Sequence, residues 1–320
     1  MILVRRLRAV RSIIAVALLM GGVVAGTAEQ EEQQEFVSCS TVLFGDSVSF
    51  SCSDPEFEAR LRAEALTPEE ARAVGCEPII WDDESGADPA SRPEPEVVTT
   101  FGPEPTYSPR TPDPAVAVRV NRAWDRIERR LGAHASGTLR RLNPPAKPEH
   151  LAQWEGSHNR RLPDDLYASL LRHDGAGGNL GNGFHLPPTY GLLGLTGIDS
   201  VNRNRCHDLV VGGDLEAADP ERGKWHGSLL AIGSTGTGKN LFVEPRTGRI
   251  GEVGWNENLR YDGPMGWPSY VAMLEALAGS LEAGTALRGR HPIVTGDCEL
   301  RWAEEPMKTP PPGCAGDPRP

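Results

Sequence analysis

The sequence lacks closely spaced cysteine pairs, a complete catalytic motif and an apolar run long enough to be an unambiguous membrane span. Its six cysteines form no C-x-x-C pair, so the ligand spacing of a structural zinc site is absent. The apolar run from Ser12 to Gly26 is shorter than the ~20 residues that a membrane-spanning helix needs. No cysteine follows this run directly, which argues against lipid attachment there.

The first residues have the pattern of a secretory signal peptide. Four arginines precede the apolar run, and small residues continue to Ala28 before an acidic stretch begins at Glu29. This order predicts a signal peptide over residues 1–28, with an uncleaved membrane anchor as the alternative. We therefore expect an extracytoplasmic protein.

Export makes disulfide bonds the default state of the cysteines. Sequence alone does not choose among the many pairings of six cysteines. Short local loops favour two of the bridges, and the remaining two cysteines would then tie the N-terminal region to the rest of the chain. The predicted pairs are Cys39 with Cys52, Cys298 with Cys314, and Cys76 with Cys206.

The charge of the chain is strongly acidic. Residues 1–28 contain four arginines and no acidic residue, so their removal changes the formal net charge from −11 to −15. Such a field disfavours nucleic acid and anionic membranes and favours a basic protein partner. Solubility outside the cell is the alternative explanation of the same charge.

A proline-rich segment divides the chain. Eight of the 32 residues from Asp83 to Pro114 are proline, which predicts an extended linker. It separates a small cysteine-containing module, residues 29–82, from a larger domain, residues 115–290, and residues 291–320 form a C-terminal tail. The module has few apolar residues, and we expect it to depend on its disulfides.

The larger domain has helices first, then strands, then a helix, which predicts the α+β class. Apolar residues from Val116 to Leu131 recur on one helical face, and Pro148 and Pro163 each begin a further helix. Runs at 192–195 and 209–211 predict strands or strand edges. Three runs separated by glycine-rich turns, 229–232, 241–243 and 250–253, predict an antiparallel meander, and a helix over 269–282 closes the domain.

Several short motifs occur in an order that resembles one known family. They are Trp124-Asp125-Arg126-Ile127-Glu128, Glu155, Leu162-Pro163-Asp164-Asp165-Leu166, His173-Asp174-Gly175, Leu186-Pro187, Trp225, Leu230-Ala231-Ile232 and a hairpin ending at Val253. This order resembles the SUKH superfamily, which includes fungal cell-wall assembly regulators and bacterial toxin-immunity proteins. The resemblance implies a mixed β-sheet with packed helices and a non-enzymatic protein-binding role without a cofactor. It also suggests an immunity-like or envelope-associated partner.

Residues Gly233 to Asn240 nearly match a phosphate-binding loop. The motif requires Ser or Thr after the lysine, and Asn240 follows Lys239 here. It also requires a helix after the loop, whereas the next residues favour a strand. We therefore predict a hairpin turn.

The rival function is a secreted hydrolase. Ser47 follows Gly45-Asp46 as in one esterase family, yet no histidine has an aspartate three residues before it, and a nucleophile without a base is inert. His173, Asp174 and His185 could form an acid-base or metal site, but Asp174-Gly175 more simply ends a helix.

The aromatic residues give the best candidates for partner contact. Trp225 precedes a predicted strand and should lie in the core. Trp255 and Trp267 flank a polar, glycine-containing loop that also holds Asn256 and Tyr261. Exposed aromatics anchor many protein interfaces, so we predict that this loop faces the partner.

Overall fold

The computed structural model describes residues 54–81, 107–177, 183–307, 311 and 313–314 in full, and residues 39–44 and 47–52 by their backbone. The predicted signal peptide and residues 83–106 of the predicted linker lie outside the described residues. Among the helices that are described, none combines the length and apolar character required to cross a membrane.

Residues 39–81, here called the N-terminal module, form a small α/β unit. Its elements are β1 (Cys39–Phe44), β2 (Ser47–Cys52), α1 (Pro55–Glu64), α2 (Pro68–Ala73) and β3 (Ile79–Trp81). The sheet order is β1-β2-β3, with β1 and β2 antiparallel and β2 and β3 parallel. Asp54 caps α1, and Thr67 and Glu70 form a capping box on α2.

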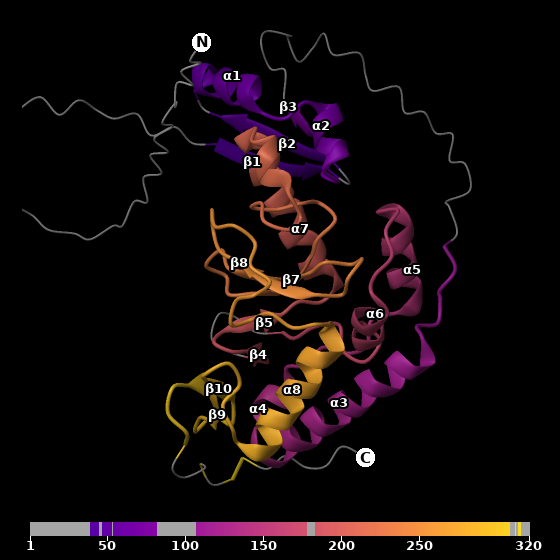
Figure 1. Cartoon of the computed structure of the whole chain (residues 1–320), viewed down its shortest axis with the longest axis vertical. Helices are drawn as coiled ribbons and strands as arrows, with labels where there is room; N and C mark the ends of the chain where they lie inside the picture. The colour runs from indigo at the N-terminus through magenta and orange to yellow at the C-terminus, as the bar shows by residue number, and fades with distance from the viewer. Residues whose placement is uncertain are drawn as a thin grey trace, which may run out of the picture. The chain divides into compact units, whose positions relative to one another are not determined.

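Residues 107–307, here called the main domain, place helices against a five-stranded antiparallel sheet of order β4-β5-β6-β7-β8 (Figure 1). Strands β9 and β10 form a separate hairpin. The elements are α3 (Pro114–His134), α4 (Ser136–Arg140), α5 (Pro148–Ser157), α6 (Asp164–Leu170), β4 (His185–Leu186), β5 (Tyr190–Leu192), α7 (Leu195–Gly212), the 3₁₀-helix η2 (Leu215–Ala218), β6 (Leu230–Ser234), β7 (Asn240–Val243), β8 (Ile250–Val253), α8 (Tyr270–Ala283), β9 (His291–Val294) and β10 (Leu300–Ala303). The predicted α+β class is confirmed.

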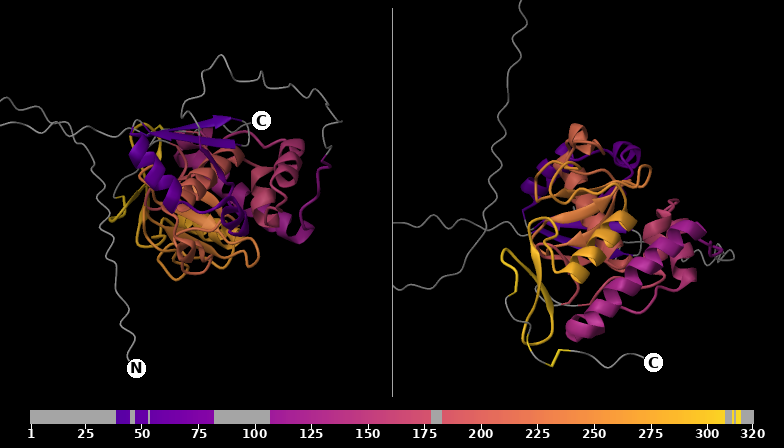
Figure 2. Two further views of the ribbon diagram at one scale, coloured as in Figure 1. Left: turned by 90° about the horizontal axis from the view of Figure 1, so that it is seen from above. Right: turned by 60° about the horizontal axis from the view of Figure 1, so that its bottom comes forward.

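The main core lies between the sheet and the pair α3 and α8, which lie side by side (Figure 2). The predicted apolar face of α3 is buried from Val120 to Leu131, and Val116 is partly buried against the same core. Trp124 and Ile127 are fully enclosed. The meander predicted at 229–253 is the strand series β6, β7 and β8, and the predicted closing helix is α8. Trp225 is 1% exposed, as predicted.

The prediction of a strand at 209–211 is wrong, because these residues form the last turn of α7. The run at 192–195 contributes only its first residue to β5, and Leu195 begins α7. Only Ile198, Leu209 and Val210 are buried on this helix, so it has no regular apolar stripe. The short apolar run of three residues at its end therefore resembled a strand.

Two predicted disulfides are present. Cys76 and Cys206 are bridged with their Cα atoms 5.4 Å apart, and Cys298 and Cys314 are bridged at 5.0 Å. Cys39 and Cys52 are directly opposite in the β1–β2 register, but their side chains lie outside the described part, so this bridge stays a prediction.

The Cys76–Cys206 bridge reinforces an apolar cluster that the N-terminal module shares with the end of α7 and with η2. Leu66 N donates to Val210 O at 2.9 Å, and Gly227 N donates to Val74 O at 2.9 Å. The domain boundaries drawn from the sequence stay a prediction, and any truncation at the linker would expose this shared cluster.

Replacing Cys76 and Cys206 together by serine should lower the free energy of unfolding by about 2–5 kcal/mol, because a long loop in the unfolded chain is released. Denaturant unfolding under non-reducing conditions measures the loss. The matched control replaces Cys298 and Cys314, whose sequence separation is 16 instead of 130. A larger loss in the control would contradict the assigned role of the long-range bridge.

Candidate functional site

Trp255 is the most exposed large apolar side chain in the described part of the chain, with 58% of its surface accessible. It follows β8 and lies against the turn between β6 and β7. Gly238 in that turn has φ +82°, and a Cβ there would come within 3.1 Å of the Trp255 ring. The tryptophan therefore rests on backbone that only glycine provides.

Arg205 of α7 holds this turn in place. Its guanidinium donates to Gly238 O at 2.7 Å, to Gly254 O at 3.1 Å and to the side-chain oxygen of Asn240 at 2.7 and 2.9 Å. Burial lowers the pKa of Arg205, and the group stays charged because arginine titrates far above neutrality. One half-buried cation thus connects the β6–β7 turn to the end of β8.

Polar side chains border the exposed tryptophan. Lys224 Nζ donates to Asn256 Oδ1 at 2.7 Å, and Lys239 is exposed on the turn. Asn256 has φ +55°, a left-handed conformation that asparagine tolerates. We call Lys224, Gly238, Lys239, Trp255 and Asn256 the Trp255 platform.

The other two aromatic candidates are held within the fold. Tyr261 donates its hydroxyl to Pro220 O at 2.7 Å and packs edge-on against Phe242. Trp267 is 7% exposed, and the Arg288 guanidinium lies 4.6 Å from its ring centroid. These residues attach the loop to the sheet, whereas Trp255 and Asn256 remain accessible.

The segment that resembles a phosphate-binding loop is the β6–β7 hairpin turn, as predicted. Thr235 Oγ1 accepts from the backbone N–H groups of Thr237 and Lys239, and Ser234 Oγ accepts from Gly236 N–H. These amides are therefore satisfied by hydroxyls of the turn itself, and a strand follows where a nucleotide site needs a helix.

His173 and Asp174 make structural contacts. His173 Nε2 pairs with Glu128 Oε1 at 2.9 Å and Nδ1 with Asn143 O at 2.9 Å. The prediction that Asp174 and Gly175 end a helix is wrong, because α6 ends at Leu170. Asp174 Oδ1 instead accepts from Leu195 N at 2.6 Å and caps the beginning of α7.

The remaining candidates of the hydrolase hypothesis do not join this pair. His185 Nδ1 contacts Gly183 O at 3.0 Å, and burial lowers the pKa of its ring. The Ser47 side chain lies outside the described part, so that alternative stays a hypothesis. Within the described residues, no three His, Cys, Asp or Glu side chains are grouped as metal ligands would be.

Two charged motif residues also bind within the chain. Glu155 accepts from Leu162 N at 2.8 Å and from Arg110 Nε at 3.1 Å. Asp164 accepts from Arg110 Nη1 at 2.6 Å. Both carboxylates are used to fix the segment before α3 against α5 and α6.

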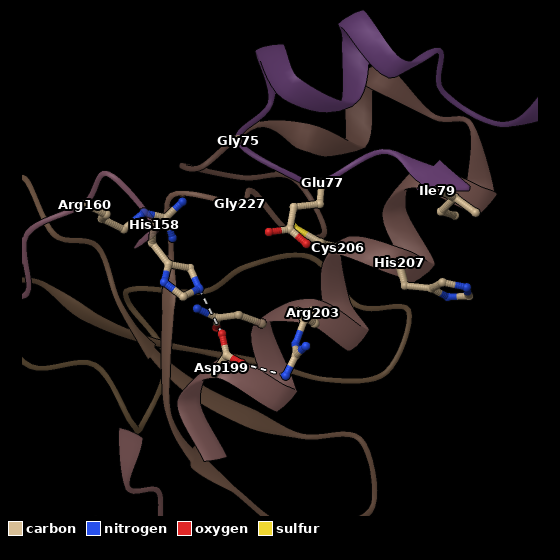
Figure 3. Close-up of a pocket in the computed structure, with 11 residues that line it drawn as sticks. Gly75, Glu77, Ile79, His158, Arg160, Asp199, Arg203, Cys206, His207 and Gly227 are labelled. Carbon is tan, nitrogen blue, oxygen red and sulfur yellow. Dashed lines mark hydrogen bonds and ion pairs between the residues drawn. The ribbon is translucent and has the colours of Figure 1, made fainter. Parts of the chain in front are cut away.

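A pocket that the sequence did not reveal lies between the N-terminal module and α7 (Figure 3). His158 Nε2 pairs with Asp199 Oδ1 at 2.9 Å, and Arg203 Nη2 with Asp199 Oδ2 at 2.7 Å. The Asp199 carboxylate raises the pKa of His158. The lining residues are Gly75, Glu77, Ile79, His158, Arg160, Asp199, Asn202, Arg203, Cys206, His207 and Gly227.

This pocket is poorly suited to catalysis. Both His158 ring nitrogens are occupied, since Nδ1 contacts Trp154 O at 2.9 Å, and Cys206 is in a disulfide. Its volume is about 60 Å³, well below the roughly 300–1,000 Å³ of a typical small-molecule site. In the sequence, only the predicted Cys76–Cys206 bridge indicated that the N-terminal module and α7 come together at this pocket.

The α+β domain thus combines an exposed aromatic platform with polar motif residues that bind within the fold. Residues 145–271 match the model of the SMI1 / KNR4 family (SUKH-1), so the chain carries a SUKH superfamily domain. The match extends from the segment before α5 into the start of α8 and contains the whole Trp255 platform. No curated protein matches the chain.

The Glu128 contacts predict a pH dependence of stability. Burial alone would raise the pKa of Glu128, but hydrogen bonds from His173 and Arg172 outweigh it and lower the pKa from 4.5 to about 2. A depressed folded-state pKa stabilises the fold above pH 4.5, and this contribution is lost as the pH falls toward 2. Allowing for solvent screening, it amounts to roughly 1–2 kcal/mol.

Urea unfolding of the wild type and of Glu128→Gln, compared between about pH 6 and about pH 3, measures this contribution. The variant should be less stable near pH 6, and the difference should shrink toward pH 3. A difference that does not change with pH would contradict the assignment.

Arg205→Met should lower stability by about 2–3 kcal/mol, because three buried or half-buried oxygens lose their donor. Urea unfolding measures the loss. Lys239→Ala is the matched control, since its exposed side chain should contribute no more than about 0.5 kcal/mol. Equal effects of the two changes would show that Arg205 does not hold the platform.

Proposed function

We propose that this protein is exported and binds a protein partner through the Trp255 platform, without catalysis. The observation that supports the proposal best is an exposed tryptophan that lies on a turn held by Arg205. The SUKH domain agrees with a binding role, since the superfamily includes immunity and regulatory proteins.

The platform has the properties of a binding hot spot. Tryptophan is enriched among the residues that dominate interface energies. Arg205 and Gly238 fix the surface before a partner arrives, so less conformational entropy is lost on binding. Lys224, Lys239 and Asn256 supply a polar rim.

A non-enzymatic role agrees with the state of the polar groups. His173, Asp174 and Glu155 each hold a backbone or side-chain partner within the fold. The residues that resemble a nucleotide site form a hairpin turn. These contacts occupy His173 and Asp174, two of the four catalytic candidates, within the fold.

Export is supported by the signal-peptide pattern and by two disulfides, which are typical of oxidising compartments. An extracytoplasmic position favours an envelope-associated partner or an immunity-like role outside the cytoplasm.

The charge of the chain is unevenly divided. Residues 29–106 contain 19 acidic and 4 basic residues, whereas residues 107–307 contain 24 acidic and 23 basic residues. A basic partner would therefore be attracted by the N-terminal part of the chain.

Trp255→Ala should weaken capture of the partner from a native envelope extract by at least about 30-fold, which corresponds to about 2 kcal/mol for a central aromatic. The immobilised full chain is the bait, and quantitative mass spectrometry measures the captured protein. Stability should change little, because the side chain is exposed.

Leu215→Ala is the control, since it removes another exposed apolar side chain, 47% accessible, at a different place. It should leave capture unchanged. If Trp255→Ala captures the same proteins in the same amounts as the wild type, the platform is not the binding surface.

A further inference from the structure

Five arginines lie on one face of α3. They are Arg119, Arg122, Arg126, Arg129 and Arg130. At 3.6 residues per turn their positions fall within an arc of roughly 100°. The apolar face of the same helix, which includes Trp124 and Ile127, is buried on the other side.

Two of these arginines are paired with α8. Arg119 binds Glu275 through Nε and Nη2 at 2.9 and 2.8 Å, and Arg126 binds Glu282 through the same atoms at 3.0 and 2.5 Å. Both the arginines and the glutamates are seven residues apart. We call Arg119 and Arg126 the inner row.

A second pair repeats this spacing without a direct ion pair among the described residues, although Arg122 and Arg129 lower the pKa of Glu275 and of Glu282 at longer range. Arg122 and Arg129 are exposed and also seven residues apart, and we call them the outer row. Within the described part of the chain, no carboxylate lies within 4.0 Å of either guanidinium. Arg130 is directed to His134, with 2.7 Å between Nη1 and Nε2.

The surroundings of the outer row favour a protein ligand. Val118, one turn before Arg122, is 56% exposed and lies on the same side of α3. Asp125 also lies beside this row and shares Arg172 with Glu128, at 2.9 Å from Arg172 Nη2. The exposed surface therefore combines two guanidinium groups that have no direct ion pair to a described residue with one apolar side chain and the Asp125 carboxylate.

We propose that the outer row binds an acidic helix of a protein partner, whose two carboxylates are seven residues apart and whose apolar side chain covers Val118. The inference rests on the proposed binding function. The inner row shows the required geometry within this molecule, because Glu275 and Glu282 present carboxylates to α3 at the same spacing. Guanidinium groups favour such two-point contacts with carboxylates.

A second copy of this chain fits the outer row poorly. Helix α1 carries Glu56, Glu58 and Glu64, and no two of them are seven residues apart. The two acidic residues of α2 are adjacent. The described acidic helices of the N-terminal module therefore do not reproduce the spacing that α8 uses.

The test uses the oxidised full chain and two alanine-based helical peptides of equal composition, in isothermal titration at low salt. One peptide carries two glutamates seven residues apart, and the other carries them five residues apart, on different faces of the helix. The first should bind roughly five- to tenfold more tightly than the second. Arg122→Gln with Arg129→Gln should remove this preference.

The control variant, Arg161→Gln with Arg222→Gln, removes the same charge from side chains that are 69% and 88% exposed and should keep the preference. Arg122→Lys with Arg129→Lys keeps the charge and should lose part of the affinity. Equal binding of both peptides, or an unchanged preference in the outer-row glutamine variant, would overturn the inference.

Phosphatidylglycerol vesicles form a further arm. Vesicle binding that depends on Arg122 and Arg129, with no peptide preference, would replace the acidic helix by a membrane surface and would also overturn the inference. Trp255→Ala should leave binding of the peptide to the outer row intact. Loss of peptide binding and loss of partner capture therefore test the outer row and the Trp255 platform separately.

Discussion

The packing of the SUKH domain depends on the short segment His173–Gly175. His173 joins α3 through Glu128, and Asp174 caps the first turn of α7. Gly175 has φ +71° and approaches Gly194 so closely that a Cβ would come within 2.2 Å of the Gly194 nitrogen. This one turn thereby contacts both α3 and α7 and orients the two helices. His173 and Asp174, whose residue types could suggest catalysis, make these structural contacts instead.

The elements with local signals could be predicted from the sequence. Apolar periodicity marked α3, and Pro148 marked the beginning of α5. Glycine-rich turns between short apolar runs marked β6 to β8, and the cysteine positions indicated both described disulfides. Helix α7 was missed because its contacts are divided between the N-terminal module and the sheet, so no single apolar face develops. Of the aromatic candidates, Trp255 is exposed and Trp267 is buried, a difference set by tertiary packing that no local pattern records.

The candidate surfaces could be predicted only in part. Trp255 and Asn256 were identified by composition, but the support from Arg205 depends on three segments that meet only in the folded chain. The two rows of arginine on α3 can be read from spacing, yet only the positions of Glu275 and Glu282 show which row is paired. The overall acidity of the chain likewise hid a nearly balanced domain, because the excess of acidic residues lies in 29–106. The charge of each segment and of each helix face therefore indicates a binding surface better than the net charge of the whole chain does.

We propose that the SUKH domain binds a protein at the Trp255 platform. Hydrogen–deuterium exchange of the full chain, with and without the captured partner, locates the surface that the partner covers. Binding at the platform should slow exchange in the β6–β7 turn, residues 235–239, and in residues 254–257. Protection confined to other parts of the chain, with these two segments unchanged, would show that the partner binds elsewhere.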